Sequence, residues 1–292
     1  MAKQRNTLRR IIAIVAGAVF LFAGYKVYQY LAEVHASRQL TDSLIDAAVC
    51  TQAPSPTALP ATVTPSPTDS PIPSAAATPS EMPSATPVPE TPAPQATPAP
   101  EYAPLTVDFA ALHAQNDDIV GWIYCPDTPI NYPIVQAVNN RYYLYRLLDG
   151  SWNSAGSLFM DYRNSADFSD WNSIVFGHNM RNNSMFGCLK EFRNQDYYEA
   201  HPVMYLLTPQ KDYKVELVAG YVAPNVSAVY GFPEADFERD ELIASAIADS
   251  SFRADVSLPE DARFLTLSTC TQDFKNARYI VIGLLSELDR LP

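Results

Sequence analysis

The chain has 292 residues, of which 47% are hydrophobic, and a formal net charge of −12. This length allows one or two domains, and the acidic balance excludes the basic surface with which proteins bind nucleic acids. The cysteines, Cys50, Cys125, Cys188 and Cys270, show no CxxC spacing, and the histidines form no HxxxH pair. We therefore predict no metal site, no organic cofactor and no disulfide framework.

The N-terminus has the pattern of a membrane anchor. Residues 1–10 form a tail with four basic side chains, and residues 11–31 are apolar apart from Lys26 and Gln29. A helix of that length measures about 31 Å, enough to cross a hydrocarbon core of about 30 Å. We predict a transmembrane signal-anchor helix at 11–31 with a cytoplasmic N-terminus, followed by a juxtamembrane helical segment at 32–50 and an extracellular remainder. A cleaved signal peptide is the alternative.

Residues 51–104 are dominated by proline, threonine, serine and alanine, and contain 16 of the 25 prolines. Such a composition buries too little apolar surface to fold, and dense proline favours extended polyproline II. We predict a disordered stalk that lifts a folded domain, residues 105–292, off the membrane. Cys50, just before the stalk, is interpreted as a solvent-facing thiol.

The sequence pattern after residue 105 is typical of a β-rich domain. Apolar runs bounded by turn residues predict eight strands, at 119–124, 131–135, 157–160, 173–176, 203–208, 213–222, 264–268 and 279–285. Helical spacing predicts a short helix at 107–114, a helix or turn at 142–148, a helical face at 185–192 and a long amphipathic helix at 236–251. Many short strands with few helices are typical of a closed or nearly closed β-barrel.

Three residues near predicted strand ends have the chemistry of a thiol enzyme. Cys270 follows a strand that alternates apolar and polar residues, and Arg278 comes eight residues later. A cysteine in such a place is by itself typical of core packing. His178 follows another strand, on a turn that contains glycine. An imidazole can activate a thiol and protonate a departing amine, and a guanidinium offers forked donors to a developing oxyanion.

Two motifs together resemble a known family. The run TLSTC (266–270) followed by Arg278, with the run GHNM (177–180) upstream, resembles the signature of sortases, the surface-protein transpeptidases of Gram-positive bacteria. The segments 118–123, 130–136 and 156–161, and the long helix before the Cys-bearing strand, resemble class B sortases in particular. The resemblance covers residues from about 105 to 285.

The resemblance implies a fold and a reaction. It implies a mainly β fold, a closed eight-stranded sortase barrel with an N-terminal helix and a long helix inserted before the Cys-bearing strand. Cys270 would attack the threonine carbonyl of a C-terminal sorting signal to form a thioacyl enzyme, with His178 as general acid/base and Arg278 binding substrate and stabilising the oxyanion. A cell-wall precursor amine would then take the acyl group. By motif position, four residues resemble those that line the peptide groove, namely Asn140, Leu144, Ser268 and Thr269.

Three alternatives remain open. A class B pilin polymerase would use a pilin amine as acceptor, and a plain cysteine peptidase would use water. A stalked adhesion or scaffold domain would keep the barrel without activity. In some relatives, an acidic residue two positions after the cysteine has been assigned a role. This chain has Gln272 at that position and Asp273 at the next. We therefore assign no such role to either residue.

Overall fold

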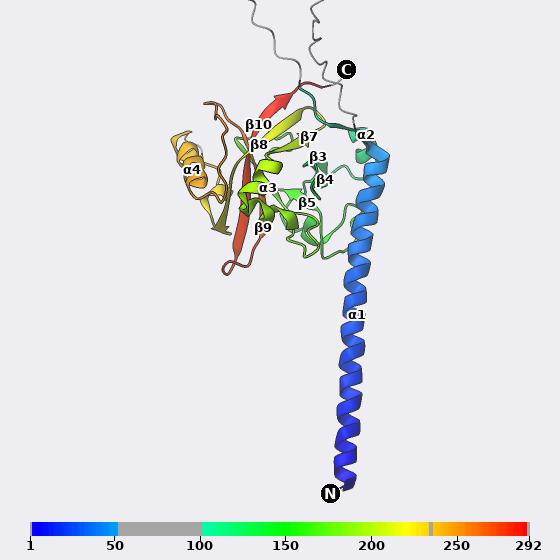
Figure 1. The fold of residues 1–292 in the computed structure, drawn as a ribbon. Helices are drawn as coiled ribbons and strands as arrows, with labels where there is room; N and C mark the ends of the chain where they lie inside the picture. Colours follow the sequence, from blue (N-terminus) through cyan, green and yellow to red (C-terminus); the bar gives the residue numbers. More distant parts are fainter. Residues whose placement is uncertain (1, 52–100, 234–235, 291–292) are drawn as a thin grey trace, which may run out of the picture. The chain divides into compact units, whose positions relative to one another are not determined.

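The folded part of the chain is a closed β-barrel (Figure 1). The computed structural model describes residues 2–51, 101–233 and 236–290. Around the barrel the strands follow the order β10, β8, β7, β3, β4, β5, β6, β9, and neighbours are antiparallel except in the parallel pairs β4–β5 and β6–β9. The strands are β3 (Ile119–Tyr124), β4 (Asn131–Val135), β5 (Leu158–Met160), β6 (Asn172–Phe176), β7 (Val203–Leu207), β8 (Asp212–Pro224), β9 (Phe264–Cys270) and β10 (Ala277–Leu288). The predicted mainly β, eight-stranded closed barrel is confirmed.

Apolar side chains from every part of the sheet fill the barrel. Side chains alternate between the two faces of a strand, so each strand sends every second residue inward. The inward set includes Ile123, Val175, Leu217, Leu267 and Val281, each no more than 1% exposed. This continuous core fixes the strand registers that position the site.

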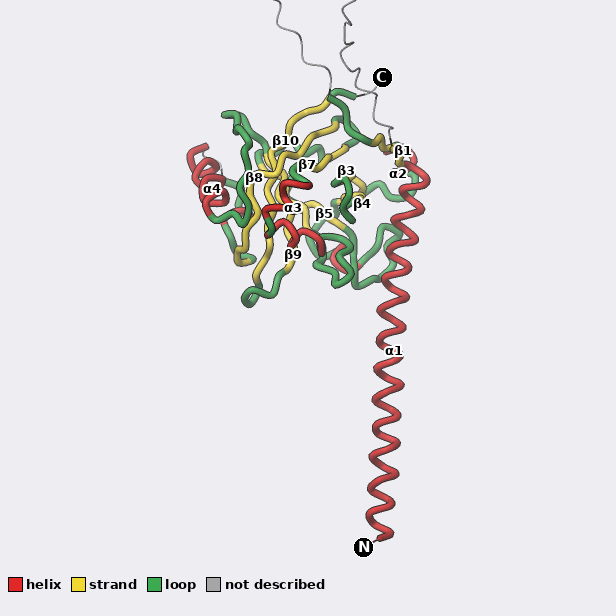
Figure 2. Tube along the Cα trace, in the orientation of Figure 1, coloured by secondary structure: helices red, strands yellow, loops and turns green. Residues whose placement is uncertain are grey.

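A helix covers one outer face of the barrel. The helix α4 (Asp236–Ala248), inserted before the Cys-bearing strand as predicted, lies beside the sheet (Figure 2). Its residues Ile243 and Ala246 belong to a second apolar cluster that includes Phe264 and Ile280. Residues 264–269 of β9 are consequently buried on both faces. The alternation of apolar and polar residues in β9 does not mark an exposed face, because α4 and the 225–232 segment cover its polar side.

The short helices differ most from prediction. They are α2 (Phe109–His113), η1 (Tyr143–Tyr145), η2 (Gly187–Arg193), α3 (Gln195–Ala200) and η3 (Ala228–Tyr230), where η denotes a 3₁₀ helix. Asp108 lies outside α2 as its N-cap and accepts a hydrogen bond from Ala111 N at 3.0 Å. The predicted face at 185–192 is buried, but on a turn followed by a 3₁₀ helix. α3 was not predicted because six residues are too few to show a helical period.

The N-terminal helix α1 (Ala2–Ala48) has two distinct halves. Apolar side chains from Ile12 to Leu31 are exposed, whereas Ser37, Leu44 and Ala48 are buried against the folded domain. Spacings of seven and four residues place these three on one helix face. Among the described residues, α1 is the one helix long and apolar enough to cross a membrane.

A two-stranded sheet follows α1. β1 (Val49–Thr51) pairs antiparallel with β2 (Leu105–Val107), with Cys50 opposite Thr106. The helical segment expected at 32–50 therefore ends two residues early, because Val49 and Thr51 are β-branched and find a strand partner. The domain also begins before 105, since Ala103 is buried. Most of the predicted stalk, residues 52–100, lies outside the described residues.

Candidate active site

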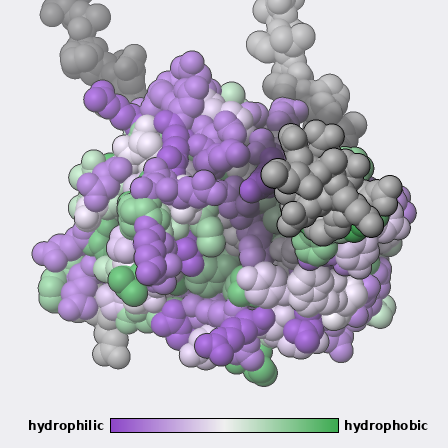
Figure 3. Space-filling model, turned by 90° about the horizontal axis from the view of Figure 1, so that it is seen from below, coloured by the Kyte–Doolittle hydropathy of each residue, from purple (hydrophilic) through white to green (hydrophobic). Residues whose placement is uncertain are grey.

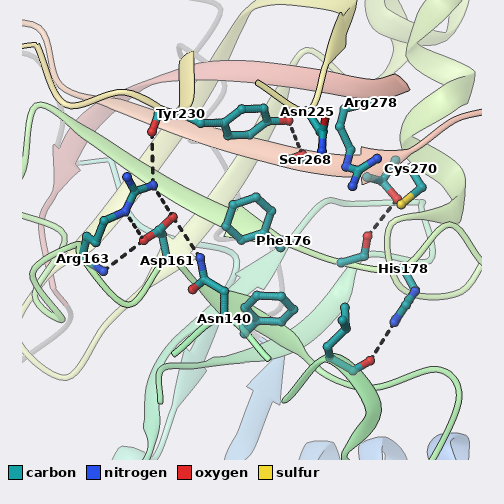
Figure 4. Close-up of a pocket in the computed structure, with 14 residues that line it drawn as sticks. Asn140, Asp161, Arg163, Phe176, His178, Asn225, Tyr230, Ser268, Cys270 and Arg278 are labelled. Carbon is teal, nitrogen blue, oxygen red and sulfur yellow. Dashed lines mark hydrogen bonds and ion pairs between the residues drawn. The ribbon is translucent and has the colours of Figure 1, made fainter. Parts of the chain in front are cut away.

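The strand registers bring Cys270, His178 and Arg278 to one end of the barrel. In the parallel pair β6–β9, Phe176 lies opposite Ser268. His178 and Cys270 each come two residues later, so both leave their strands at the same edge. In the antiparallel pair β9–β10, Arg278 lies directly opposite Cys270, where Cβ atoms are typically about 5 Å apart. Figure 4 shows Arg278 beside Cys270, with His178 on the same side of the pocket.

Three hydrogen bonds attach the His178 turn to the strand that carries Cys270. Thr269 Oγ1 donates to Gly177 O at 2.8 Å, Gly177 N donates to Ser268 O at 3.1 Å, and Asn179 Nδ2 donates to Cys270 O at 2.8 Å. A Cβ at position 177 would lie 2.4 Å from Leu158 Cδ2. Any larger residue would therefore displace the buried Leu158 and Phe186 side chains, and glycine lets the turn hold histidine and cysteine in fixed relative positions.

A backbone carbonyl fixes the tautomer of His178. The ring atom Nε2 lies 2.7 Å from Leu144 O. Because a carbonyl oxygen can only accept, Nε2 carries a proton and Nδ1 holds the lone pair of the neutral ring. The Tyr145 ring also packs against the imidazole, with centroids 5.4 Å apart. His178 is thus held with Nδ1 as the nitrogen that can exchange a proton.

All seven residues singled out in the sequence line one cavity of about 360 Å³. The catalytic candidates lie at one end, the aromatic ring of Phe176 lies in the middle, and the polar group of Asn140, Asp161 and Arg163 lies at the other end (Figure 4). The cavity is lined by Asn140, Leu144, Phe159, Asp161, Arg163, Phe176, Gly177, His178, Asn225, Tyr230, Ser268, Thr269, Cys270 and Arg278. A thiol, an imidazole and a guanidinium at the end of a groove suit acyl transfer to and from a peptide.

Comparisons with known proteins agree with this geometry. The model of the sortase domain matches residues 123–286. The chain is 36% identical over 180 residues to sortase B of Listeria monocytogenes, covering 60% of this chain and 72% of that protein. The chain belongs to the sortase family. Its barrel also matches two solved structures, a sortase B complexed with triglycine and the sortase B–substrate complex of Staphylococcus aureus. Both matches have a TM-score of 0.59 and 28% identity over 62% of this chain. They cover 86% of the first structure's chain and 85% of the second's.

These relatives identify the chain as a class B sortase, a cysteine transpeptidase. The class predicted from the motifs is thereby confirmed. The roles proposed below for individual residues rest on their contacts in the cavity.

The far end of the sortase cavity contains an ion pair that sequence analysis missed. Arg163 donates to both carboxylate oxygens of Asp161, at 2.9 and 2.7 Å, and Asn140 Nδ2 donates to Asp161 Oδ2 at 3.1 Å. Burial opposes ionisation of this carboxyl, but the bonds from Arg163 and Asn140 outweigh it and lower the pKa of Asp161. Asn140 is therefore held in place by Asp161, which lies in the segment that connects β5 to β6.

The lowered pKa of Asp161 predicts a pH-dependent contribution to stability. Asp161→Asn should reduce the free energy of unfolding by about 1–3 kcal/mol at pH 7. A depressed carboxyl pKa stabilises above the unfolded value of about 3.9 and loses its effect as the pH falls through the folded value. The deficit should therefore shrink below about pH 4. Denaturant unfolding from pH 7 to pH 3 checks this, with exposed Asp117→Asn as the control; a deficit independent of pH would contradict it.

Tyr230 is a second residue that sequence analysis missed. Its hydroxyl lies 2.7 Å from Ser268 Oγ, within the cavity. Burial raises the pKa of Tyr230, despite the hydrogen bond with Ser268, so the hydroxyl stays protonated. No local pattern marks this tyrosine, which lies 38 residues before its partner.

Loss of the Tyr230 hydroxyl should lower the stability of the protein and weaken its binding of the peptide. Tyr230→Phe leaves the buried Ser268 hydroxyl without this partner, and we expect a loss of about 1 kcal/mol in stability together with a higher KM for the peptide. Thermal unfolding and steady-state kinetics measure both quantities. Tyr162→Phe, which alters a half-exposed tyrosine, is the control. Unchanged stability and KM would show that the contact is not formed in solution.

The acidic residue that follows the cysteine most closely in the sequence does not line the cavity. Asp273 accepts hydrogen bonds from Arg193 at 3.0 and 2.6 Å and from Thr271 Oγ1. The Arg193 and Thr271 hydrogen bonds lower the pKa of Asp273 to about 2. Its carboxylate therefore braces the β9–β10 turn, and Asp273 is not among the residues that line the cavity.

The remaining cysteines differ from Cys270 in their surroundings. Cys125 and Cys188 are buried in the barrel core, and burial raises the pKa of their thiols to about 11 and about 12. Both thiols stay protonated and fill apolar space. Cys50 is exposed on β1. Among the described residues, no group of three or more His, Cys, Asp or Glu side chains is arranged to hold a metal ion.

Proposed function

We propose that this sortase is a membrane-anchored enzyme that cleaves a C-terminal sorting signal after threonine and joins the protein to a cell-wall amine. One observation carries the proposal. Cys270 lies opposite Arg278 on one side and shares its barrel edge with His178 on the other. A nucleophile, a proton carrier and a fixed cation thus meet at one end of a peptide-sized groove.

In the first step, the Cys270 thiol passes its proton to Nδ1 of the neutral His178 ring, and Sγ attacks the threonine carbonyl carbon. A C–S bond forms, the carbonyl oxygen becomes an oxyanion, and the Arg278 guanidinium stabilises that charge. The C–N bond then breaks as protonated His178 delivers its Nδ1 proton to the departing amine. The products are a thioacyl enzyme and the released C-terminal fragment.

In the second step, an acceptor amine attacks the thioester. A new C–N bond forms, the C–S bond breaks, and the amine proton passes through His178 Nδ1 to the released Cys270 thiolate. The reaction exchanges one amide for another and needs no oxidant or reductant. The solved sortase B complexes with a substrate and with triglycine support peptide and amine ligands for this class.

The groove residues have separate parts in this proposal. Ser268 and Thr269 border the peptide beside the nucleophile, and Leu144 borders it while its carbonyl holds His178. Asn140 reaches the peptide farther from Cys270, with Asp161 fixing its amide. This division assigns the far end of the cavity to recognition of the sorting motif.

The anchor in this proposal is residues 11–31 of α1. The exposed apolar surface of this half of the helix supports a membrane span, and the basic residues that precede it favour a cytoplasmic N-terminus. The catalytic domain is then extracellular, where exported surface proteins and wall precursors are available.

Peptide cleavage with and without an amine tests the proposal. Sorting peptides that contain threonine before the scissile bond should give a thioacyl enzyme, and an added amine should give the new amide, both detected by mass spectrometry. Hydrolysis without amide product for any acceptor would contradict transpeptidation. A strong preference for a lysine side-chain amine in a pilin peptide would favour a pilin polymerase instead.

The forked geometry of Arg278 should matter beyond its charge. Arg278→Lys keeps the cation but loses the paired donors, and we expect kcat to fall by about 10²-fold, at the lower end of the effect of losing an oxyanion donor. Steady-state peptide-cleavage assays measure the loss. Arg263→Lys, which alters an exposed ion pair with Glu287 at the other end of β9, should change kcat little. Equal effects in both variants would contradict the oxyanion role.

A further inference from the structure

The folded domain is attached to the half of α1 that follows the apolar span. Asn153 Nδ2 donates to Glu33 O at 2.8 Å, and Ser154 Oγ donates to the Glu33 carboxylate. At the C-terminal end of this half, Asp108 N donates a hydrogen bond to Ala48 O at 2.8 Å. The helix from Glu33 to Ala48, about 22 Å long, thus lies along the side of the barrel.

The end of the barrel nearest the apolar span is the end that carries the site. Asn153, bound to Glu33, also donates from its backbone to Tyr145 O at 3.0 Å, and Tyr145 packs against His178. At the other end, Leu288 of β10 packs in the cluster that contains Leu44 and Ala48. Leu288 lies ten residues along the strand from Arg278, a separation of about 33 Å.

The distance from the span to this end is short. Leu31 is exposed and apolar, and Glu33 already contacts the domain. Two helical residues correspond to about 3 Å. If residues 11–31 cross the bilayer, the loop around Asn153 lies at the level of the lipid headgroups.

That loop exposes the residue types that membrane interfaces favour. Trp152 is 65% exposed, Tyr145 46% and Tyr142 40%, and Arg146 lies over the Tyr142 ring at 4.8 Å. Tryptophan and tyrosine concentrate at headgroup depth. Asp149 is the carboxylate of this loop, and its oxygen accepts a hydrogen bond from Ser151 N at 2.9 Å. Apolar patches (green) interrupt the hydrophilic surface at this end of the molecule (Figure 3).

We propose that the Tyr142–Trp152 loop rests on the outer bilayer surface, so that the mouth of the catalytic cavity faces the lipid headgroups. This inference rests on the membrane anchor proposed above. The pairing of β1 with β2 supports it, because both ends of the 52–104 segment are tied to the domain at Thr51 and Leu105. Because both ends of this segment are held at the domain, its length cannot change the distance between the domain and the membrane. The half of α1 that packs on the domain sets that distance. Substrates held in the same membrane then meet the site at high effective concentration.

Tryptophan quenching in the full-length protein tests this arrangement. The chain has three tryptophans: Trp122 is fully buried, and Trp171 precedes β6, at the strand end away from His178. The protein is reconstituted in phosphatidylcholine and phosphatidylglycerol vesicles whose acyl chains are brominated near the headgroup. We expect quenching in the parent and in Trp171→Phe, and loss of that quenching in Trp152→Phe.

Two further variants test whether the packed half of α1 or the Pro-rich segment sets the distance between the domain and the membrane. Joining Gln52 to Glu101 by a short Gly/Ser linker should leave the Trp152 quenching unchanged, whereas four alanines inserted after Leu31 should reduce it and leave cleavage of a soluble peptide intact. Changed quenching on shortening the segment would overturn the inference. Release of the parent by alkaline carbonate would overturn the anchor and the inference together, while an inserted protein with unquenched Trp152 would overturn the inference alone.

Discussion

Cys270→Ala should abolish both thioacyl formation and amide transfer, with a fall in rate of about 10⁴-fold or more, as for loss of an enzymic nucleophile. The reason is chemical: no other described thiol lines the cavity. The variant should keep its thermal stability, because Cys270 is exposed at the end of β9. Intact-protein mass spectrometry after incubation with a sorting peptide detects the trapped acyl group.

The chain contains its own matched control for this variant. Cys50 is also exposed, but lies on β1, outside the cavity. Cys50→Ala should retain trapping and transfer at the parent rate. Continued trapping in Cys270→Ala, or loss of trapping in Cys50→Ala with an intact fold, would remove Cys270 from the role of nucleophile.

The sequence is sufficient to predict the strands and to place Cys270, His178 and Arg278 at or beside strand ends, for a physical reason. Buried strands require apolar runs, and residues that follow a strand end are placed at the barrel edge. What joins His178 to Cys270 is the parallel register in which Phe176 lies opposite Ser268. Two strands separated by almost ninety residues carry no local sign of that register, so the motif resemblance was needed to bring the residues together.

Other parts of the site depend on contacts that no short pattern encodes. Tyr230 reaches Ser268 only because the segment after β8 folds over the outer face of β9. Asp161 and Arg163 lie in a stretch of Asn, Asp and Ser that is typical of a loop, and only the closed barrel buries the Asp161 carboxylate. Long-range burial therefore decides which polar residues serve the groove.

The N-terminal region shows the same limit. Its composition predicts an anchor and a spacer, and a three-residue strand such as β1 is too short to leave a periodic signal. Its partner, β2, begins 54 residues after Thr51. The packing of residues 33–48 along the barrel follows from contacts such as Asn153 to Glu33, which link positions 120 residues apart.

His178→Ala should lower kcat for an amide substrate by about 10²–10⁴-fold, the usual contribution of a general acid. The departing amine is a poor leaving group without a proton, and the Leu144 carbonyl fixes Nδ1 as the atom that delivers it. An ester of the same peptide leaves as an alcohol and needs that proton less. The variant should therefore lose markedly less activity on the ester, measured as acylation rates on the matched substrates.

His113 provides the comparison that separates chemistry from packing. Its Nε2 lies 2.8 Å from Ile119 O, nearly the same contact with a backbone carbonyl that His178 makes with Leu144. His113 lies on α2, outside the cavity. His113→Ala removes an equivalent hydrogen bond and should leave the amide-to-ester ratio unchanged. If His178→Ala lost activity equally on both substrates, its imidazole would be structural, and proton delivery would have to come from another group of the cavity.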